Sequence, residues 1–418
     1  MVRFSNNAIT VTKSWQTETP TVYLVSKGKR AACKIEEQNP DTVRTAIEDL
    51  VKTLKMTPRG DVDFDLPRGP FKYQSIPGIF DKKLANIESE LVDGVGAAIN
   101  AARKEGATRV SGVVISNAWE RFVRTSAGAE GSDKGTEVEI TVRAFVTDDA
   151  SGQGISLATS LDKFNPEHAG RTAGGIAKMA QGPESGKAGK YNVVFGPTIF
   201  ANLLNRVGDF SSAYTVDLGL SCFRNKLKQK VASENFTLYD NSRLPNGPGS
   251  VALDDEGYPT QDICLVLNGT LETYLHSSYT AAKYNAALTG SAHFEAGIAG
   301  MSPFPRNLVL EGGDMKLEDL FDLARDGLYV TNNWYTRFQN YQTGDFSTIC
   351  RDGIFEIKNG KIGHPVKGLR LSDNMIRILQ SAKAMSKDRD WVKWWEVDTP
   401  TLTPYVLVEG AGITIAQK

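Results

Sequence analysis

Cysteine is scarce in this chain of 418 residues, which contains only four copies of it. The four positions, Cys33, Cys222, Cys264 and Cys350, lie far apart and form no Cys-x-x-Cys pair. This spacing argues against a zinc knuckle and against a small disulfide framework. Reduced, buried thiols in a cytosolic protein are the simplest interpretation. The chain begins without an apolar signal segment, so we expect a cytoplasmic location.

Histidine is just as rare, with four copies at positions 168, 276, 293 and 364. No two of them are three or four residues apart on an expected helix, so the sequence lacks the helical histidine pair of zincin-like peptidases. We interpret each single histidine as a packing or surface residue. His276 precedes two serines, but neighbours in sequence do not converge as the members of a catalytic triad must.

Long apolar runs and an excess of either charge are also missing. No run approaches the roughly 20 apolar residues that span a membrane, and the formal net charge of −1 indicates no basic surface for nucleic acid. We therefore expect neither a membrane nor a nucleic acid as a partner. No phosphate-binding loop is present. With 40% apolar and 23% charged residues, the composition is typical of a soluble globular protein of two or three domains.

Three helices are predicted in the first half of the chain. The first runs from residue 40 to about residue 54, is capped by Asn39, and has apolar residues every three or four positions along one face. A second, longer helix is expected from about residue 81 to residue 105, with Gly106 as its stop. Asn165-Pro166 opens the third helix by the same device as the first.

The remaining sequence is rich in predicted strands. A Gly-rich loop joins two strands expected within 110–128 and 135–149, and Asn359-Gly360 is typical of a hairpin turn. We predict an α+β fold, with an N-terminal mixed α/β region of long amphipathic helices and a largely antiparallel β domain at the C-terminal end. The expected domains are residues 1–106, 107–190 and 191–418.

One acidic stretch raises a question of chemistry. Asp254, Asp255 and Glu256 stand directly before Gly257. They form either a carboxylate cluster that serves a reaction or an acidic turn whose side chains accept backbone N–H groups. From the residues alone, both interpretations stay open.

A group of tryptophans near the C-terminus is a second candidate site. Trp391, Trp394 and Trp395 lie among basic residues of the same stretch. They could stack nucleic-acid bases, pack against a partner subunit or cover the final strands of the fold. Covering the final strands is the commonest outcome for such a group.

Several motifs follow one another in a fixed order from residue 217 onward. They are Ser221-Cys222-Phe223, Gln229-Lys230-Val231-Ala232-Ser233, Asp255-Glu256-Gly257-Tyr258-Pro259-Thr260, Asn268-Gly269-Thr270-Leu271, Glu311-Gly312-Gly313-Asp314 and Thr343-Gly344-Asp345-Phe346-Ser347. This order resembles the TldD/PmbA family, whose two subunit types form a cytoplasmic metallopeptidase. The resemblance implies that residues 254–257 form a tight turn rather than a set of zinc ligands, and it leaves a contact with peptide or partner open.

The resemblance also indicates the subunit type. The catalytic type carries His-Glu-x-x-x-His on a helix before the Ser-x-Phe motif, and a cysteine near its C-terminus is the third zinc ligand. Here Leu204, Asn205 and Asp209 stand at the three helix positions, and residues 386–418 contain no cysteine. Leucine cannot bind zinc, and asparagine cannot act as a general base. The chain thus resembles the PmbA (TldE) type, for which we expect no cofactor on this chain and zinc on the partner.

The leading hypothesis is a non-catalytic subunit that pairs with a zinc-bearing, TldD-type chain and helps to degrade small or unfolded peptides. Without that partner, the chain could form a homodimer, including a homodimeric peptide-binding protein. A second hypothesis is an autonomous metallopeptidase with Asp209, Asp254, Asp255 and His276 as ligands. A third, a binding protein for nucleic acid or gyrase-like machinery, finds no support in the net charge. The expected contacts to peptide or partner are Asp254, Asp255, Glu256, His276, Trp391, Trp394 and Trp395.

Overall fold

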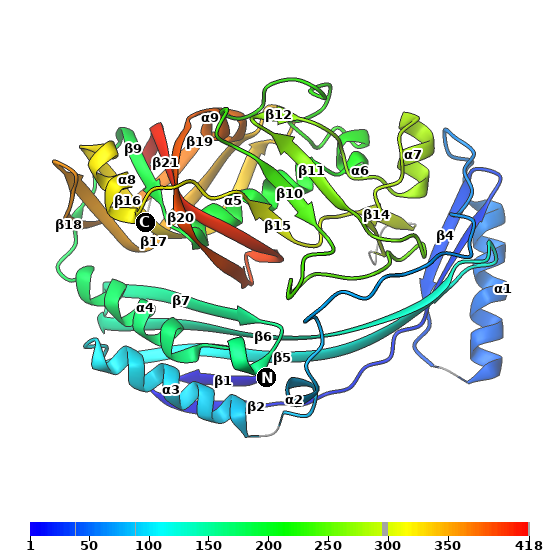
Figure 1. The fold of residues 1–418 in the computed structure, drawn as a ribbon, viewed down its shortest axis with the longest axis horizontal. Helices are drawn as coiled ribbons and strands as arrows, with labels where there is room; N and C mark the ends of the chain where they lie inside the picture. Colours follow the sequence, from blue (N-terminus) through cyan, green and yellow to red (C-terminus); the bar gives the residue numbers. More distant parts are fainter. Residues whose placement is uncertain (38, 88, 295–299, 417–418) are drawn as a thin grey trace.

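The computed structural model describes residues 1–37, 39–87, 89–294 and 300–416. In Figure 1, a long curved sheet from the first part of the chain lies beneath a second, larger β-region that contains most of the later strands. Strands dominate after residue 190, with short helices between them. The structure therefore confirms the predicted α+β class and the largely β character of the C-terminal part.

The first sheet takes its strands from both ends of the N-terminal region. In spatial order its antiparallel strands are β2 (Ala8–Thr12), β1 (Val2–Ser5), β5 (Arg109–Arg124), β6 (Glu130–Thr147) and β7 (Ala150–Ala158). Helices α3 (Glu90–Lys104) and α4 (Pro166–Met179) pack on one face, where Val110, Val114 and Ile140 are fully buried. Residues from both sides of position 106 share this sheet and its core, and the division expected there stays a prediction.

Two helices begin where the sequence predicts. Asn39 Oδ1 accepts the N–H of Thr42 at 2.8 Å at the start of α1 (Pro40–Met56). Asn165 Oδ1 accepts the N–H of His168 at 2.9 Å at the start of α4. In both, the asparagine satisfies a backbone donor that the first turn leaves without an intrahelical acceptor.

The apolar face of α1 is less buried than its periodicity suggests. Leu50 is the one residue of α1 that the structure buries, while Ile47 and Val51 are exposed. The helix packs against a hairpin of β3 (Thr21–Ser26) and β4 (Lys29–Lys34) at one end of the molecule, away from the helices of the first sheet (Figure 1). A two-stranded hairpin offers too little surface to cover the whole face.

The single helix expected over residues 81–105 is wrong, because the structure divides it into α2 (Lys82–Ala85) and α3. Asn86 Nδ2 donates to the carbonyl of Lys82 at 2.7 Å, so this side chain competes for the backbone and ends the first helix. Residue 88 lies outside the described residues. The predicted stop is confirmed, since Gly106 has a φ of +107° after the last turn of α3.

The second, larger sheet is mostly antiparallel. The pairs β15–β21, β9–β16 and β8–β18 are parallel. In spatial order its strands are β12 (Thr270–Leu271), β11 (Asp262–Leu267), β10 (Leu238–Asn241), β15 (Leu308–Leu310), β21 (Val397–Ile415), β9 (Gly189–Phe195), β16 (Gly327–Asn340), β17 (Asp345–Lys358), β18 (Lys361–Lys367) and β8 (Glu184–Ser185), with β19 (Leu369–Asn374) and β20 (Ala382–Trp394) paired beside them.

Helix α5 (Pro197–Phe210) lies against this sheet and is buried along most of its length. Its apolar residues join the largest hydrophobic core of the protein. The remaining elements are η1 (Leu161–Lys163), α6 (Ala213–Asp217), α7 (Ser278–Tyr284), β13 (Ala292–Phe294), β14 (Met301–Pro303), α8 (Leu317–Ala324) and α9 (Met375–Gln380). Within the described ranges, none of the helices has the length and apolar composition that crossing a bilayer requires.

Candidate functional site

The two faces of the β5–β6 pair carry different kinds of residue. Because side chains alternate along a strand, Val138 and Ile140 of β6 point to the helices, while Glu137 and Glu139 point to the opposite face. Asn117, directly opposite Glu137, belongs to that same polar face of β5. This polar face is turned toward the C-terminal region and forms one wall of a cavity.

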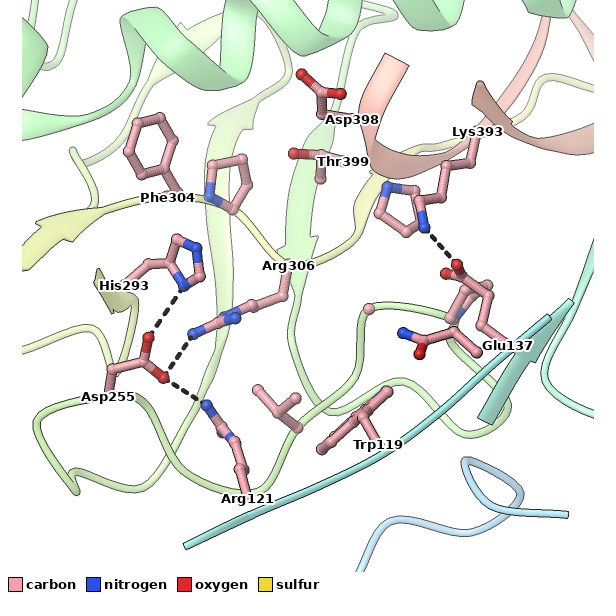
Figure 2. A pocket seen from close by; sticks show the side chains of 16 residues that line it. Trp119, Arg121, Glu137, Asp255, His293, Phe304, Arg306, Lys393, Asp398 and Thr399 are labelled. Atoms are coloured by element: carbon pink, nitrogen blue, oxygen red, sulfur yellow. Dashed lines mark hydrogen bonds and ion pairs between the residues drawn. The ribbon is translucent and has the colours of Figure 1, made fainter. Parts of the chain in front are cut away.

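The cavity has a volume of about 750 Å³ and lies between the two sheets (Figure 2). β5 and β6 supply one wall, and loops and strands of the C-terminal region supply the others. It is lined by Asn117, Trp119, Arg121, Glu137, Pro248, Gly249, Val251, Asp255, His293, Phe304, Pro305, Arg306, Lys393, Asp398, Thr399 and Pro400.

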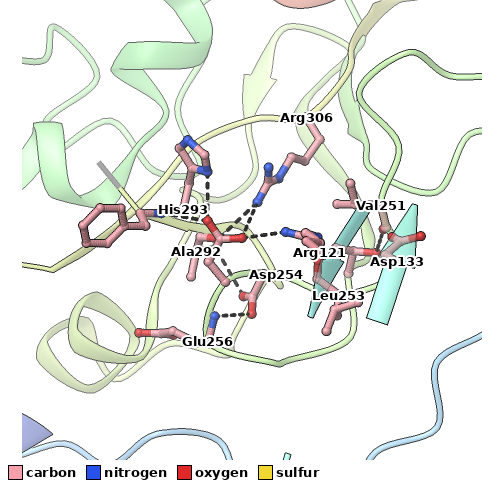
Figure 3. A network of polar contacts seen from close by, with 12 residues as sticks. Arg121, Asp133, Val251, Leu253, Asp254, Glu256, Ala292, His293 and Arg306 are labelled. Carbon is pink, nitrogen blue, oxygen red and sulfur yellow. Dashed lines mark hydrogen bonds and ion pairs between the residues drawn. The ribbon is translucent and has the colours of Figure 1, made fainter. Parts of the chain in front are cut away.

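Asp255 joins the two halves of the protein at one end of this cavity. Its carboxylate lies 2.6 Å from Arg121 Nη1, 3.7 Å from Arg306 Nη2 and 3.0 Å from His293 Nδ1 (Figure 2). Figure 3 shows these three partners together with Asp254 and Glu256. Burial acts to raise the pKa of Asp255, but His293 and the two guanidinium groups together hold that pKa well below its usual range. Asp255 is therefore ionised, and its ion pair with Arg121 connects the C-terminal region to strand β5.

Asp254 has a different role, because its carboxylate holds the turn together. It accepts the N–H groups of Glu256 at 3.0 Å, Tyr258 at 2.9 Å and Ala292 at 3.1 Å. The N–H of Gly257 donates to the Asp254 carbonyl at 3.1 Å, and Gly257 has a φ of +78°. The tight turn expected at residues 254–257 is confirmed. Burial raises the pKa of Asp254 to about 6.

The Glu256 side chain binds neither the turn nor the arginines and instead contacts the start of α7. Its Oε2 accepts from the backbone N of Ser278 at 2.8 Å and from its hydroxyl at 2.6 Å. The other oxygen, Oε1, is buried without a hydrogen-bond partner among the residues that the structure describes. Burial, and after it the nearby Asp254 carboxylate, raise the pKa of Glu256 to about 8.

Lys393 of β20 marks the other end of the cavity. It forms an ion pair with Glu137 and lies 3.8 Å from Glu139. Burial raises the pKa of Glu139 to about 7, against the opposing effect of Lys393. Asp398 is exposed at the same end and makes no ion pair or side-chain hydrogen bond within the described part of the chain. This end therefore has more carboxylates than cations.

His276 is buried among aromatic side chains. Its ring packs on Tyr274 and Tyr284, with ring centroids 6.5 and 6.0 Å away, and burial lowers the pKa of His276 to about 4. Asp209 instead forms an ion pair with Arg206 at 3.0 Å. The described residues contain no group of three or more His, Cys, Asp or Glu side chains that could hold a metal, so the ligand set of the autonomous hypothesis is not assembled there.

The three tryptophans of the C-terminal group differ in exposure. Trp394 is buried against Trp334, Trp391 is half-buried, and Trp395 is exposed beside Tyr335. Trp394 thus fits the covering role, since it belongs to a small hydrophobic core. A contact of Trp395 with a partner or with peptide stays a prediction.

Of the three compared positions on α5, only Asp209 has a side chain that could bind zinc, and its carboxylate pairs with Arg206. Leu204 is completely buried in the hydrophobic core. Asn205 is occupied by β21: its Nδ2 donates to Thr401 Oγ1 at 2.8 Å and to the Thr399 carbonyl at 3.1 Å, while its Oδ1 accepts the N–H of Thr399 at 3.0 Å. Because Thr399 lines the cavity, α5 stands directly behind the cavity wall.

Comparisons with known proteins agree with this architecture. A family model described as the PmbA/TldA metallopeptidase C-terminal domain matches residues 188–415, and one described as the central domain matches residues 85–181. The chain belongs to the TldD/PmbA family. TldE from Thermococcus kodakarensis has the same fold as this family member, with a TM-score of 0.88 over 99% of this chain and 93% of that chain, at 21% identity.

Several curated relatives of this TldD/PmbA-family chain are named as metalloproteases. One from Methanocaldococcus jannaschii is 31% identical over 208 residues, which are 48% of this chain and 44% of that protein. A metalloprotease TldD homologue from Buchnera aphidicola is 28% identical over 237 residues, 55% of this chain and 47% of that protein. The chain spans about half the length of these relatives.

Sequence reasoning found Asp255 in this TldD/PmbA-family chain but missed the residues that accompany it at the cavity. One signal was available, because the alternation of glutamates with valine and isoleucine at residues 137–140 marks a strand with one polar face. No sequence signal showed that this face meets loops more than a hundred residues later. The missed residues are Arg121, Glu137, Glu139, His293, Arg306, Lys393 and Asp398.

Proposed function

We propose that this chain is the non-catalytic subunit of a cytoplasmic TldD/TldE-type zinc peptidase. The observation that carries the proposal is the use of α5. Leu204 is part of the hydrophobic core, Asn205 is hydrogen-bonded to β21, and Asp209 forms an ion pair with Arg206. The side chains that would have to hold and activate a metal are thus absent or committed to the fold.

A zinc peptidase needs ligands that are imidazole, thiolate or carboxylate groups, together with a general base near the bound water. Of the three compared residues of α5, only Asp209 belongs to these ligand types, and it pairs with Arg206. The described residues contain no group of three or more His, Cys, Asp or Glu side chains that could hold a metal. Under the proposal, the partner subunit supplies the zinc, which would activate water for attack on the peptide bond. This chain supplies walls around the substrate.

Native mass spectrometry, metal analysis and a peptidase assay test the proposal together. The purified chain should contain no stoichiometric zinc and should not cleave peptides. Mixed with the TldD-type protein from the same organism, it should form a dimer of the two chains. We expect peptidase activity in the mixture to exceed that of either chain alone by more than about tenfold, since chemistry and substrate enclosure then combine.

The TldD-type protein alone, at the same zinc concentration, is the matched control for this assay. One bound zinc per chain together with activity of this chain alone would overturn the proposal and support the autonomous peptidase. Failure to form a mixed dimer, with homodimers only, would favour the homodimeric peptide-binding protein.

A further inference from the structure

The cavity between the sheets is lined by charged side chains to which the proposed function assigns no role. Its volume of about 750 Å³ lies within the range of small-ligand sites, about 300–1,000 Å³. Asn117 and Asp398 are exposed at the cavity, so it opens to solvent. The two ends carry different charged groups, with Asp255, Arg121 and His293 at one and Lys393 with Glu137 at the other (Figure 2), and apolar residues also line the cavity.

The first end offers unused guanidinium donors. A guanidinium has five N–H donors, and Arg306 uses only its Nη2 within the described part of the chain, toward the Ala292 carbonyl at 3.2 Å and toward Asp255. The Nε atoms of Arg306 and Arg121 are both buried without a partner among the described residues. Asp254 lies next to Asp255 in the sequence, but its carboxylate already accepts three backbone N–H groups.

A carboxylate is the ligand that satisfies such an end. Planar guanidinium donors bind carboxylates with paired, charge-assisted hydrogen bonds. Among the described residues, Asp255 is the acid that forms ion pairs with Arg121, Arg306 and His293. Burial, and after it repulsion from the neighbouring Arg306, lower the pKa of Arg121, against the opposing effect of the Asp255, Asp133 and Asp254 carboxylates. A second carboxylate would relieve this repulsion.

The opposite end suits a positive group. Lys393 is shared by Glu137 and Glu139, and Asp398 has no partner among the described residues. An ammonium group would therefore find at least one free carboxylate there. Apolar and proline residues also line the cavity, namely Trp119, Pro248, Val251, Phe304, Pro305 and Pro400.

We propose that this cavity binds a short peptide with free ends, its α-carboxylate at Arg306 and Arg121 and its α-ammonium at Asp398. The inference deepens the proposed function, because it assigns a peptide-binding site to the non-catalytic chain itself. It needs neither zinc nor the partner subunit. A peptide bound here is selected by its two charged termini, and its side chains contact the apolar residues that line the cavity.

Calorimetric titration of the purified chain alone tests this inference. The probes are alanine peptides of two to five residues with free termini, and the best of them is then tested as its N-acetylated and its C-amidated form. We expect one peptide bound per chain. Each cap should weaken binding by at least about tenfold, a change of about 1.4 kcal/mol. No binding of any probe, or equal binding of capped and free forms, would overturn the inference.

Two substitutions test which end of the cavity binds which terminus of the peptide. In Asp398→Asn, the free and acetylated peptides should bind equally, while the amide should still bind more weakly. In Arg306→Gln, the acid and amide should bind equally, and Arg306→Lys should restore part of the difference. Asp398 is exposed, so its substitution does not threaten folding. Unchanged preferences in both variants would show that the termini bind elsewhere.

Matched controls and the partner assay separate this inference from the proposed function. Asp388→Asn changes an exposed aspartate of β20 that does not line the cavity, and Arg243→Gln changes an arginine that donates to the Gln74 carbonyl instead. Both should bind as the unmodified chain does. Peptidase activity in the mixture without peptide binding by this chain alone would remove the inference and keep the proposed function.

Discussion

Replacing Asp255 with alanine should lower the free energy of unfolding by about 3 kcal/mol, because it leaves two buried guanidinium groups without their carboxylate. Arg121 and Arg306 lie on different halves of the protein, and Asp255 is the acid that serves both. Their side chains are 20% and 15% exposed. This partial exposure places the expected loss at the lower end of the range for buried pairs rather than above it.

Urea unfolding followed by tryptophan fluorescence measures this loss. Asp149→Ala is the matched control, because Asp149 forms an ion pair of similar length with Lys367, at 2.8 Å, but both side chains are about half exposed. We expect that control to cost no more than about 1 kcal/mol. A similar shift of the midpoint in both variants would contradict the anchoring role of Asp255.

A double substitution tests the specific partner. The double variant Asp255→Ala/Arg121→Gln removes the carboxylate together with one of the two guanidinium groups that pair with it. We expect the double variant to lose less stability than the sum of its two single variants, with a coupling of about 1–3 kcal/mol. Additive losses would mean that the contact of 2.6 Å between Asp255 and Arg121 contributes nothing.

The fold was most predictable where the signal is local. Asn39 and Asn165 begin helices because each side chain reaches a backbone donor three residues later. Asn359 and Gly360 form the predicted hairpin turn between β17 and β18, with φ angles of +48° and +77°. Such devices involve neighbours in sequence, so a pattern is enough to predict them.

The cavity was not predictable in the same way, because its contacts are made over long separations. Arg121 and Asp255 are 134 residues apart, and Lys393 and Glu137 are 256 apart. The alternation around Glu137 indicates a polar strand face, but a polar face is ordinarily left to solvent. Only the folded chain shows that the C-terminal region covers it.

The acidic triplet shows the same limit within three residues. As sequence, Asp254, Asp255 and Glu256 are equivalent carboxylates before a glycine. In the fold, one holds a turn, one anchors two arginines and one lies at the start of α7. The turn could be expected from the glycine and the aspartate, whereas the division of roles depends on which element each side chain meets.

Between pH 6.5 and pH 8, stability should fall as pH rises, and Glu256→Gln should remove part of this fall. The pKa of Glu256 is about 8 in the folded protein, against an ordinary value of 4.5. The folded state therefore holds a proton that the unfolded state has lost, so stability decreases with increasing pH until the folded pKa is passed. Glutamine resembles the protonated acid and can still accept from Ser278.

Urea midpoints measured at pH 6.5 and pH 8 decide this prediction. At pH 8 we expect Glu256→Gln to be more stable than the unmodified chain by more than about 1 kcal/mol, since one unit of pKa shift corresponds to about 1.4 kcal/mol. Two other groups act outside this window. His276, with its pKa lowered to about 4, reduces stability only as pH falls below about 6.5, and the lowered pKa of Asp255 acts at still lower pH.

The exposed Glu48 of α1 provides the control, because Glu48→Gln changes the same chemical group at a solvated position. Its pH profile should run parallel to that of the unmodified chain. Glu139→Gln should flatten the profile in the same sense as Glu256→Gln, because burial also raises the pKa of Glu139, to about 7. If the profile of Glu256→Gln instead kept the full slope, Glu256 would be ionised throughout, and its buried Oε1 would have to be reached by solvent or by a cation.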